Sequence, residues 1–328
     1  MKHFYIFLYL FLLGFSQVLT SQNRAKVISS HGYDNCIELT NQWVRVVLEP
    51  NLGGRVLVYE KNGRNVLYVD TLQNGFVNTK KTANIQPAAG RFDIGPESVQ
   101  KKRLALWTGK YSFKILSNSK VMLQSPADSV SGFQITRIFE LGSASSLLRC
   151  QQIVKNISNK TQMACHWGRT FALGGGIALS PQNPMSRFPK GYCIYRPPNK
   201  TIDLSPTPEP NVRERENVLE ILGKPSNSKF VMDPSEGWLA YLSTNNLLFV
   251  KKFAIYGQKA YAEVTAASAS IWYNENIMCE IEPIGPQEFL KPNQTFSFTE
   301  DWFLEDYTFP EDRKADLKQI KNIINACK

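Results

Sequence analysis

The chain has 328 residues, 43% of them hydrophobic, and a formal net charge of +10. This length is ample to bury a core, either as one large β domain or as two smaller domains. The lysines and arginines are scattered, apart from Lys101–Arg103 and the C-terminal tail, which indicates a solvated basic surface and argues against a nucleic-acid-binding protein. The positive charge is compatible with anionic glycans as partners.

The N-terminus has the pattern of a cleaved secretory signal. Lys2 precedes an apolar run over residues 4–15, which is too short to span a bilayer and is followed by small and polar residues. We therefore expect a signal peptide over residues 1–21, with the mature chain beginning between residues 17 and 23. No later stretch has enough uninterrupted apolar residues for a membrane span. The expected protein is secreted or periplasmic and is not inserted in the membrane after cleavage.

Strand patterns dominate from residue 26 to residue 304. Residues 43–49 alternate between apolar and polar, residues 50–54 break the pattern, residues 55–60 resume it, and Asn62-Gly63 predicts a hairpin turn before residues 65–68. This is a meander and not a βαβ unit. Further strands are predicted over residues 111–116, 120–124, 132–140, 146–156, 162–173, 230–232, 237–242, 247–253, 270–274, 277–282 and 294–303. So many strands joined by short turns predict an all-β protein with antiparallel sheets packed face to face.

Two long stretches, residues 71–106 and 174–228, are rich in glycine and proline and resist strand assignment. Long loops in compact domains are often functional, so both are candidates for the rim of a cleft. Residues 311–326 place Leu317, Ile320, Ile323 and Ile324 on one stripe, which predicts a helix that packs against a sheet. We expect one domain over residues 22–310 and a short C-terminal helix within residues 311–328.

Six cysteines follow the expected signal, without the spacing of a metal site. An even number in an exported protein permits disulfides, although a chain of this size does not need them. Cys150 and Cys279 lie within apolar strand patterns, which favours buried free thiols. Cys150 with Cys165 is the one pair that is close enough along the chain to suggest a disulfide.

The predicted strand at residues 277–282 carries two acids on one face. Side chains alternate along a strand, so Glu280 and Glu282 project together with Met278, whereas Cys279 and Ile281 face the other way. A solvated face explains this pattern as well as a carboxylate held in a binding cleft does.

Three segments together resemble the galactose mutarotase-like family. Residues 41–60, followed by Asn62-Gly63, are similar to its first sheet, with a glycine break between two strands. Gly90-Arg91 is similar to the motif that the family places beside its sugar. Residues 279–283 and 290–302 look like the strand with the catalytic glutamate, the proline-containing turn and the final strand. The resemblance covers about residues 35–305 and is nearest to secreted bacterial members of unknown function.

The resemblance implies a β-supersandwich, in which two large antiparallel sheets form a sugar cleft. In the enzymes of the family a glutamate removes the proton of the anomeric hydroxyl and a histidine protonates the ring oxygen, which is aldose 1-epimerisation. By chain order, Glu282 corresponds to the base and His166 to the acid. Groups of this kind each contribute about 10²–10⁴-fold to the rate.

The remaining candidates bind sugar rather than react with it. Arg91, Arg169 and Glu280 supply polar contacts, and Trp167 supplies an aromatic face. Arg91 has an alternative role as an ion-pair partner of Asp93 or Glu97. Further aromatic candidates for a stacking platform are Trp107, Trp238, Trp272 and Tyr273.

The chain differs from the family in the residues around the histidine that acts as the general acid. The asparagine-histidine pair of true mutarotases is absent, and His166 is followed by tryptophan. The sequence therefore predicts a carbohydrate-binding or carbohydrate-active protein whose partner is a small sugar or a glycan, and it leaves open whether the protein is an enzyme. A non-catalytic glycan-binding module, a structural protein that reuses the fold, and a lyase or hydrolase are the alternatives. No metal or organic cofactor is implied, and the oligomeric state is left open.

Overall fold

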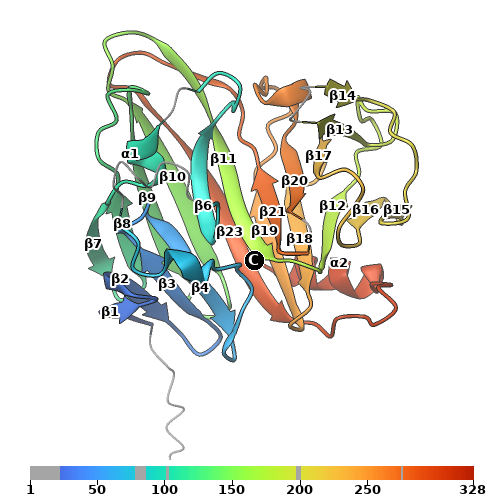
Figure 1. Cartoon of the computed structure of the whole chain (residues 1–328), viewed down its shortest axis with the longest axis horizontal. Helices are drawn as coiled ribbons and strands as arrows, with labels where there is room; N and C mark the ends of the chain where they lie inside the picture. The colour runs from blue at the N-terminus through green and yellow to red at the C-terminus, as the bar shows by residue number, and fades with distance from the viewer. Residues whose placement is uncertain (1–22, 78–85, 101–102, 197–200, 275) are drawn as a thin grey trace, which may run out of the picture.

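The computed structural model describes residues 23–77, 86–100, 103–196, 201–274 and 276–328. The signal peptide expected over residues 1–21 lies outside the described residues. Two antiparallel sheets pack face to face in these ranges, and a short helix follows the last strand (Figure 1). The predicted all-β supersandwich with a C-terminal helix is therefore confirmed.

The larger sheet has 13 strands within the described residues. Eleven form one continuous order: β1 (Arg24–Ser30), β2 (Tyr33–Thr40), β3 (Arg45–Glu49), β4 (Arg55–Lys61), β6 (Gly90–Gly95), β11 (Gln162–Leu173), β21 (Met278–Pro283), β20 (Ala269–Asn274), β17 (Lys229–Met232), β13 (Tyr192–Arg196) and β14 (Thr201–Asp203). The short strands β5 (Arg64–Asn65) and β22 (Glu288–Leu290) pair with β4 and β11. Strand β11 therefore lies near the middle of the sheet, beside β6 and β21.

The smaller sheet has 10 strands in the described part of the chain. Their order is β15 (Val212–Arg215), β16 (Val218–Ile221), β12 (Ile177–Pro181), β18 (Trp238–Ser243), β19 (Leu247–Phe253), β23 (Thr295–Asp306), β10 (Leu148–Asn156), β9 (Phe133–Leu141), β8 (Lys120–Gln124) and β7 (Ser112–Ser117). Within the residues that the structure describes, four helical segments connect or follow the strands: η1 (Thr71–Gln73), α1 (Leu104–Trp107), η3 (Val264–Ala266) and α2 (Leu317–Ala326).

The main hydrophobic core fills the space between the sheets. It includes Ile281 and Cys279 from the larger sheet and Trp302 and Phe249 from the smaller one. Alternation on each strand turns apolar side chains to this core, and burial of such side chains is the main driving force of folding. We call the face that a sheet turns toward this core its inner face and the opposite face its outer face.

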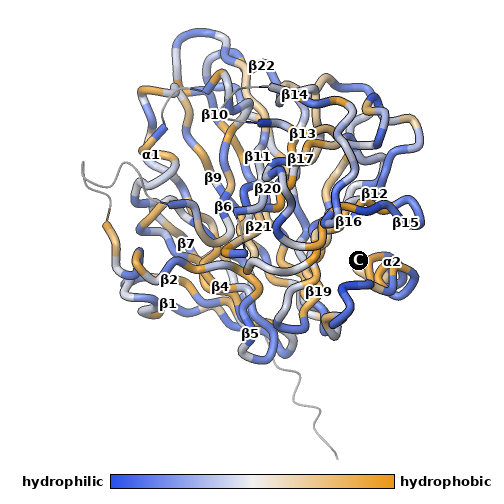
Figure 2. The backbone as a smooth tube through the Cα atoms, turned by 45° about the vertical axis from the view of Figure 1, so that its right-hand side comes forward, coloured by the Kyte–Doolittle hydropathy of each residue, from blue (hydrophilic) through white to orange (hydrophobic). Residues whose placement is uncertain are grey.

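Helix α2 covers part of the outer face of the smaller sheet. Its Leu317, Ile320 and Ile324 are buried and pack in one cluster with residues such as Trp238 and Val250. Figure 2 shows the mixed hydropathy of this helix, which lies beside β19. The stripe predicted from the sequence is thus the packing face. No helix in the described ranges is both long and apolar enough to cross a membrane.

The two stretches that were expected to be loops contain strands. Residues 174–228 hold β12, β13, β14, β15 and β16, and residues 71–106 hold β6. The sequence pattern does not reveal these strands because it is interrupted by prolines and glycines. These residues lie at turns and at points where the backbone packs closely against other groups. Gly90 opens β6, and a Cβ there would lie 2.7 Å from the Trp302 ring, so this strand needs a glycine to pack against the core.

All six cysteines are buried and free. The disulfide suggested between Cys150 and Cys165 is therefore wrong. Cys150 belongs to the core between the sheets, whereas Cys165 belongs to a separate cluster with Trp167 on the outer face of the larger sheet. The free thiols expected at Cys150 and Cys279 are confirmed.

Candidate functional site

Strand β11 presents different chemistry on its two faces. His166, Gly168 and Thr170 turn toward the core between the sheets, where Gly168 and Thr170 contact residues of the smaller sheet. Trp167 and Arg169 turn to the outer face, as alternation requires. The site residues collect on this outer face and not in the space between the sheets.

The pairing of β21 with β11 brings the two glutamates beside Arg169. Phe171 is the register partner of Glu280, so Glu280 shares the outer face with Arg169. Arg169 Nε donates to Glu280 Oε1 at 2.6 Å. Glu280 is 2% exposed and Glu282 is fully buried, so the solvated-face explanation of these acids is wrong.

Lys229 completes the charged group from the other side. Its register partner in β20 is Trp272, which in turn faces Glu280 in β21, so all three lie in one row across the sheet. The Lys229 ammonium lies 3.7 Å from Glu282 Oε2 and 3.6 Å from Glu97 Oε2. Two cations and two carboxylates therefore lie across four neighbouring strands, β11, β21, β20 and β17.

The two glutamates differ in how strongly they hold a proton. Burial raises the pKa of Glu280 to about 8; Arg169 opposes this shift, and the neighbouring Glu282 carboxylate adds to it. Burial would also raise the pKa of Glu282, but Lys229 and other neighbours outweigh it and hold that pKa below its ordinary value. We infer that at neutral pH Glu280 retains its proton and Glu282 is ionised.

Indole rings lie between the cations. The Arg169 guanidinium carbon is 4.3 Å from the Trp167 ring centroid and 4.9 Å from that of Trp107, and Lys229 Nζ is 5.3 Å from the Trp167 centroid. Such contacts stabilise a cation over an aromatic face. Trp272 is half-buried on the same face. Trp238 and Tyr273 do not contribute, because Trp238 packs under α2 and Tyr273 lies in the core.

Arg91 lies across from Arg169 as its register partner in β6. Its Nε donates to the Ala88 carbonyl at 3.2 Å and its Nη1 to the Trp107 carbonyl at 2.7 Å, while its guanidinium covers the Trp107 ring at 4.4 Å. The alternative role of Arg91, an ion pair with Asp93 or Glu97, is not found in the described structure. Arg103 pairs with Asp93 instead, at 2.6 Å.

Several buried polar atoms of this face lack a hydrogen-bond partner in the described structure. They are both carboxylate oxygens of Glu282, the hydroxyl of its register partner Ser270, the Trp167 indole Nε1 and the Arg91 Nη2. Buried polar groups in folded proteins are nearly always hydrogen-bonded, and an unsatisfied one costs about 1–3 kcal/mol. Buried acceptors and donors on one face of the sheet thus lack protein partners, which is the pattern that a polyhydroxylated ligand would satisfy.

His166 does not join Glu282. The imidazole Nε2 lies 2.7 Å from Glu300 Oε1, and Nδ1 lies 3.2 Å from the Gln152 amide nitrogen, all fully buried on the inner face. Burial lowers the pKa of His166 and keeps the ring neutral. Glu282 projects from the opposite face of the sheet, so the structure does not assemble the expected Glu282–His166 acid–base pair.

Glu300 is the centre of this inner polar cluster. Besides His166, it binds the Lys251 ammonium at 2.8 Å and accepts from the Trp302 indole at 2.8 Å. Lys251 also donates to Thr170 Oγ1 and to the Ile281 carbonyl. A Cβ at Gly168 would lie 2.1 Å from Glu300 Oε1, which explains the glycine. The cluster ties β11 and β21 to the smaller sheet directly behind the two glutamates.

Sequence reasoning missed two parts of the site. Lys229 stands at the edge of a short apolar strand, where nothing in the sequence separates it from a solvated lysine. The Arg103–Asp93 pair joins α1 to β6 and depends on a loop closure that no periodicity encodes. In the described residues, no three His, Cys, Asp or Glu side chains group closely enough to hold a metal ion.

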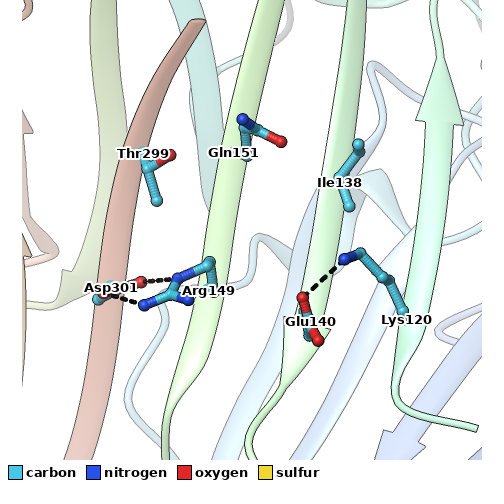
Figure 3. A pocket seen from close by; sticks show the side chains of 7 residues that line it. All are labelled: Lys120, Ile138, Glu140, Arg149, Gln151, Thr299 and Asp301. Carbon is cyan, nitrogen blue, oxygen red and sulfur yellow. Dashed lines mark hydrogen bonds and ion pairs between the residues drawn. The ribbon is translucent and has the colours of Figure 1, made fainter. Parts of the chain in front are cut away.

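A hollow of about 420 Å³ lies on the outer face of the smaller sheet. Figure 3 shows that its charges are already paired, Arg149 with Asp301 and Lys120 with Glu140. These pairs are exposed to solvent and leave no buried unsatisfied group at the hollow. The outer face of the larger sheet is therefore the better candidate site.

Several solved structures share this architecture. A galactose mutarotase-like protein from Clostridium acetobutylicum superposes with a TM-score of 0.57 at 12% identity, over 87% of this chain and 99% of that one. The chain has a galactose mutarotase-like fold. A galactose mutarotase related enzyme from Lactobacillus acidophilus gives a TM-score of 0.57 at 10% identity, over 83% and 98% of the two chains. A galactose mutarotase-like protein from Lactobacillus casei gives 0.52 at 13% identity, over 82% and 100%.

These identities support the galactose mutarotase-like fold and carry no residue roles. Searches against protein-family models and against curated proteins gave no match. The resemblance predicted from the sequence is confirmed at the level of the fold, and a fold of this kind suggests a function related to sugars.

Proposed function

We propose that the outer face of the larger sheet binds a sugar through Glu282, Arg169, Glu280 and Trp167. The observation that carries this proposal is the set of buried, unpartnered polar atoms on that face, both oxygens of Glu282 and the Trp167 nitrogen among them. Sugar hydroxyls donate to carboxylates and accept from indole and guanidinium groups, and their C–H faces stack on aromatic rings. Trp107 and Trp272, both half-buried, supply rings within reach of a ligand.

The glutamate pair favours one catalytic function, aldose 1-epimerisation. Ionised Glu282 accepts the proton of the anomeric hydroxyl, and protonated Glu280 donates a proton to the ring oxygen. The bond between the anomeric carbon and the ring oxygen breaks as the carbonyl forms. Rotation and the reverse proton transfers give the other anomer with no net change in protons. In this scheme Glu280 takes the part that the sequence predicted for His166.

Binding and anomer exchange of monosaccharides test this proposal. We expect saturation-transfer NMR to detect at least one aldose with the wild-type protein. Glu282→Gln should weaken its binding about tenfold or more, because a charge-assisted hydrogen bond is lost. Glu140→Gln, a matched change at an exposed carboxylate of the smaller sheet, should leave binding unchanged. Binding that is unaffected by Glu282→Gln would contradict the assigned site.

Exchange spectroscopy separates an enzyme from a binding module. An epimerase should interconvert the anomers of its bound sugar faster than buffer does, and Glu280→Gln should remove this acceleration while binding persists. A protein that binds the sugar without accelerating exchange is a non-catalytic sugar-binding module.

We also propose that the protein is exported. The support is the basic start and the apolar run at residues 4–15 followed by small polar residues. N-terminal sequencing of the mature protein should give a start between residues 17 and 23. An intact Met1 in the extracellular or periplasmic fraction would contradict cleavage of a signal.

A further inference from the structure

The buried cations near the site do not all have a carboxylate partner. Arg169 has Glu280, Lys229 has Glu282, Arg103 has Asp93 and Arg55 has Glu49 as carboxylate partners. Arg91 is 2% exposed and has no carboxylate partner in the described structure. Its charge is therefore uncompensated in a buried position, which is costly for a protein unless something else pairs with it.

Arg137 shows what a buried arginine without a carboxylate looks like when it is purely structural. Its guanidinium donates to the carbonyls of Gly53, Gly54 and Phe92 and to the Gln152 side chain. Every nitrogen of that guanidinium has a partner. Arg91 instead leaves Nη2 without any acceptor, although its other two nitrogens are held by backbone carbonyls. The side chain is fixed in place and one donor is kept open.

The open donor belongs to the sugar site. Arg91 and Arg169 are register partners on neighbouring strands, and both guanidinium groups lie over the Trp107 ring. Side chains of register partners are close neighbours on one face of a sheet. A ligand that contacts Arg169 and Glu280 therefore extends to Arg91 across one strand spacing, about 5 Å.

We propose that the sugar carries a carboxylate, as a uronic acid does, and that Arg91 Nη2 binds this carboxylate. This inference rests on the proposed sugar site and names its substrate class. A carboxylate supplies the missing negative charge and accepts a charge-assisted hydrogen bond from this nitrogen. A phosphate dianion fits less well, because a single open nitrogen leaves most of its oxygens without donors and the nearby Glu282 repels the second charge.

Titration calorimetry with matched sugars tests the inference. Galacturonate, glucuronate and mannuronate are compared with galactose, glucose and mannose, and with the corresponding hexose 6-phosphates. We expect at least one uronate to bind about tenfold or more tightly than its parent hexose, with affinity that falls as salt increases. Equal affinity for uronate and hexose, or tighter binding of the 6-phosphate, would overturn the inference.

Variants locate the effect at Arg91. Arg91→Gln should abolish the preference for the uronate while the parent hexose still binds, and Arg149→Gln, at an exposed arginine on the other sheet, should change neither affinity. Thermal unfolding of Arg91→Gln checks that the variant is folded. A folded variant that keeps the preference would overturn the role of Arg91.

The two proposals fail in different ways. If no hexose, uronate or hexose phosphate binds, the proposed sugar-binding function itself is wrong. If hexoses bind at the Glu282 site but uronates are not preferred, the sugar-binding function stands and only the carboxylate inference is wrong.

Discussion

Glu280 and Glu282 are two residues apart on β21, yet their surroundings give them different protonation. The pKa of Glu280 is raised by burial and by its neighbour, whereas the pKa of Glu282 is held low by Lys229. A carboxyl whose pKa is raised in the folded state stabilises the fold most below its unfolded pKa, near 4.5. That contribution is lost as the pH rises through the raised pKa.

Glu280→Gln should therefore change how stability depends on pH. Compared with the wild type, the variant should lose less free energy of unfolding as the pH rises from about 5 to 8.5, because glutamine cannot ionise. Urea unfolding at several pH values measures this difference. Parallel curves for the two proteins would show that Glu280 is not the carboxyl that retains the proton.

At the residue scale, the sequence predicts which side chains share a face of a strand, but it does not predict what surrounds that face. Alternation correctly placed Glu280 with Glu282 and His166 with Thr170. It could not tell which of the two faces of β11 turns outward, because that depends on the pairing of β11 with strands more than 70 residues away on either side. His166 is assigned to the site only by its chain order in the resemblance, and the structure places it behind the site.

At the scale of elements, Glu300 shows how one strand stabilises two sheets. It extends from β23 to contact His166 on β11 and Lys251 on β19, and all three are fully buried. Burial alone would raise the pKa of Glu300, but Lys251 and His166 outweigh it and lower the pKa to about 2. The resulting stability is present above the unfolded pKa near 4.5 and is lost as the pH falls toward 2.

Glu300→Gln should destabilise the protein by about 3–5 kcal/mol at pH 7, because it leaves Lys251 buried without its carboxylate. Urea unfolding measures the loss, and the stability of the variant should decline less steeply between pH 5 and 3. Asp301→Asn is a matched control one residue away. Its side chain pairs with Arg149 on the exposed outer face, where such a pair is worth about 0–1 kcal/mol. Equal losses in both variants would contradict the role of the inner cluster.

Strands with strong alternation were predictable, and strands built around glycine and proline were not. Strand β9 alternates along its whole length and was predicted to within one residue at each end. Strands β15 and β16 were missed because the turn between them is formed by Glu216 and Asn217, both in left-handed conformations. An Asn-Gly pair would have predicted such a turn, whereas Glu-Asn does not. The density of the remaining strands was still enough to predict the fold class.

At the scale of the whole molecule, the protein holds together without covalent cross-links. Its six cysteines are spread over both faces of the larger sheet, the core and the end of α2. Burial raises the pKa of each of the six thiols, so little reactive thiolate forms near neutral pH.

Thiol labelling should follow unfolding. In a colorimetric assay with an aromatic disulfide reagent, the native protein should release almost no product within minutes, and the protein in guanidinium should react at all six positions. The unfolding midpoint should be the same with and without a reductant. Fewer than six reactive thiols in the unreduced, denatured protein would reveal a disulfide and contradict this description.

Strand β11 supplies the proposed sugar-binding face with one set of alternate residues and the Glu300 cluster with the other, so its register is fixed from both sides. An insertion or deletion of one residue in this strand would place an indole in the space of His166 and an imidazole where Trp167 supports Arg169. Homologous chains can therefore vary in the identity of these residues, but length changes should be confined to the turns at the ends of β11.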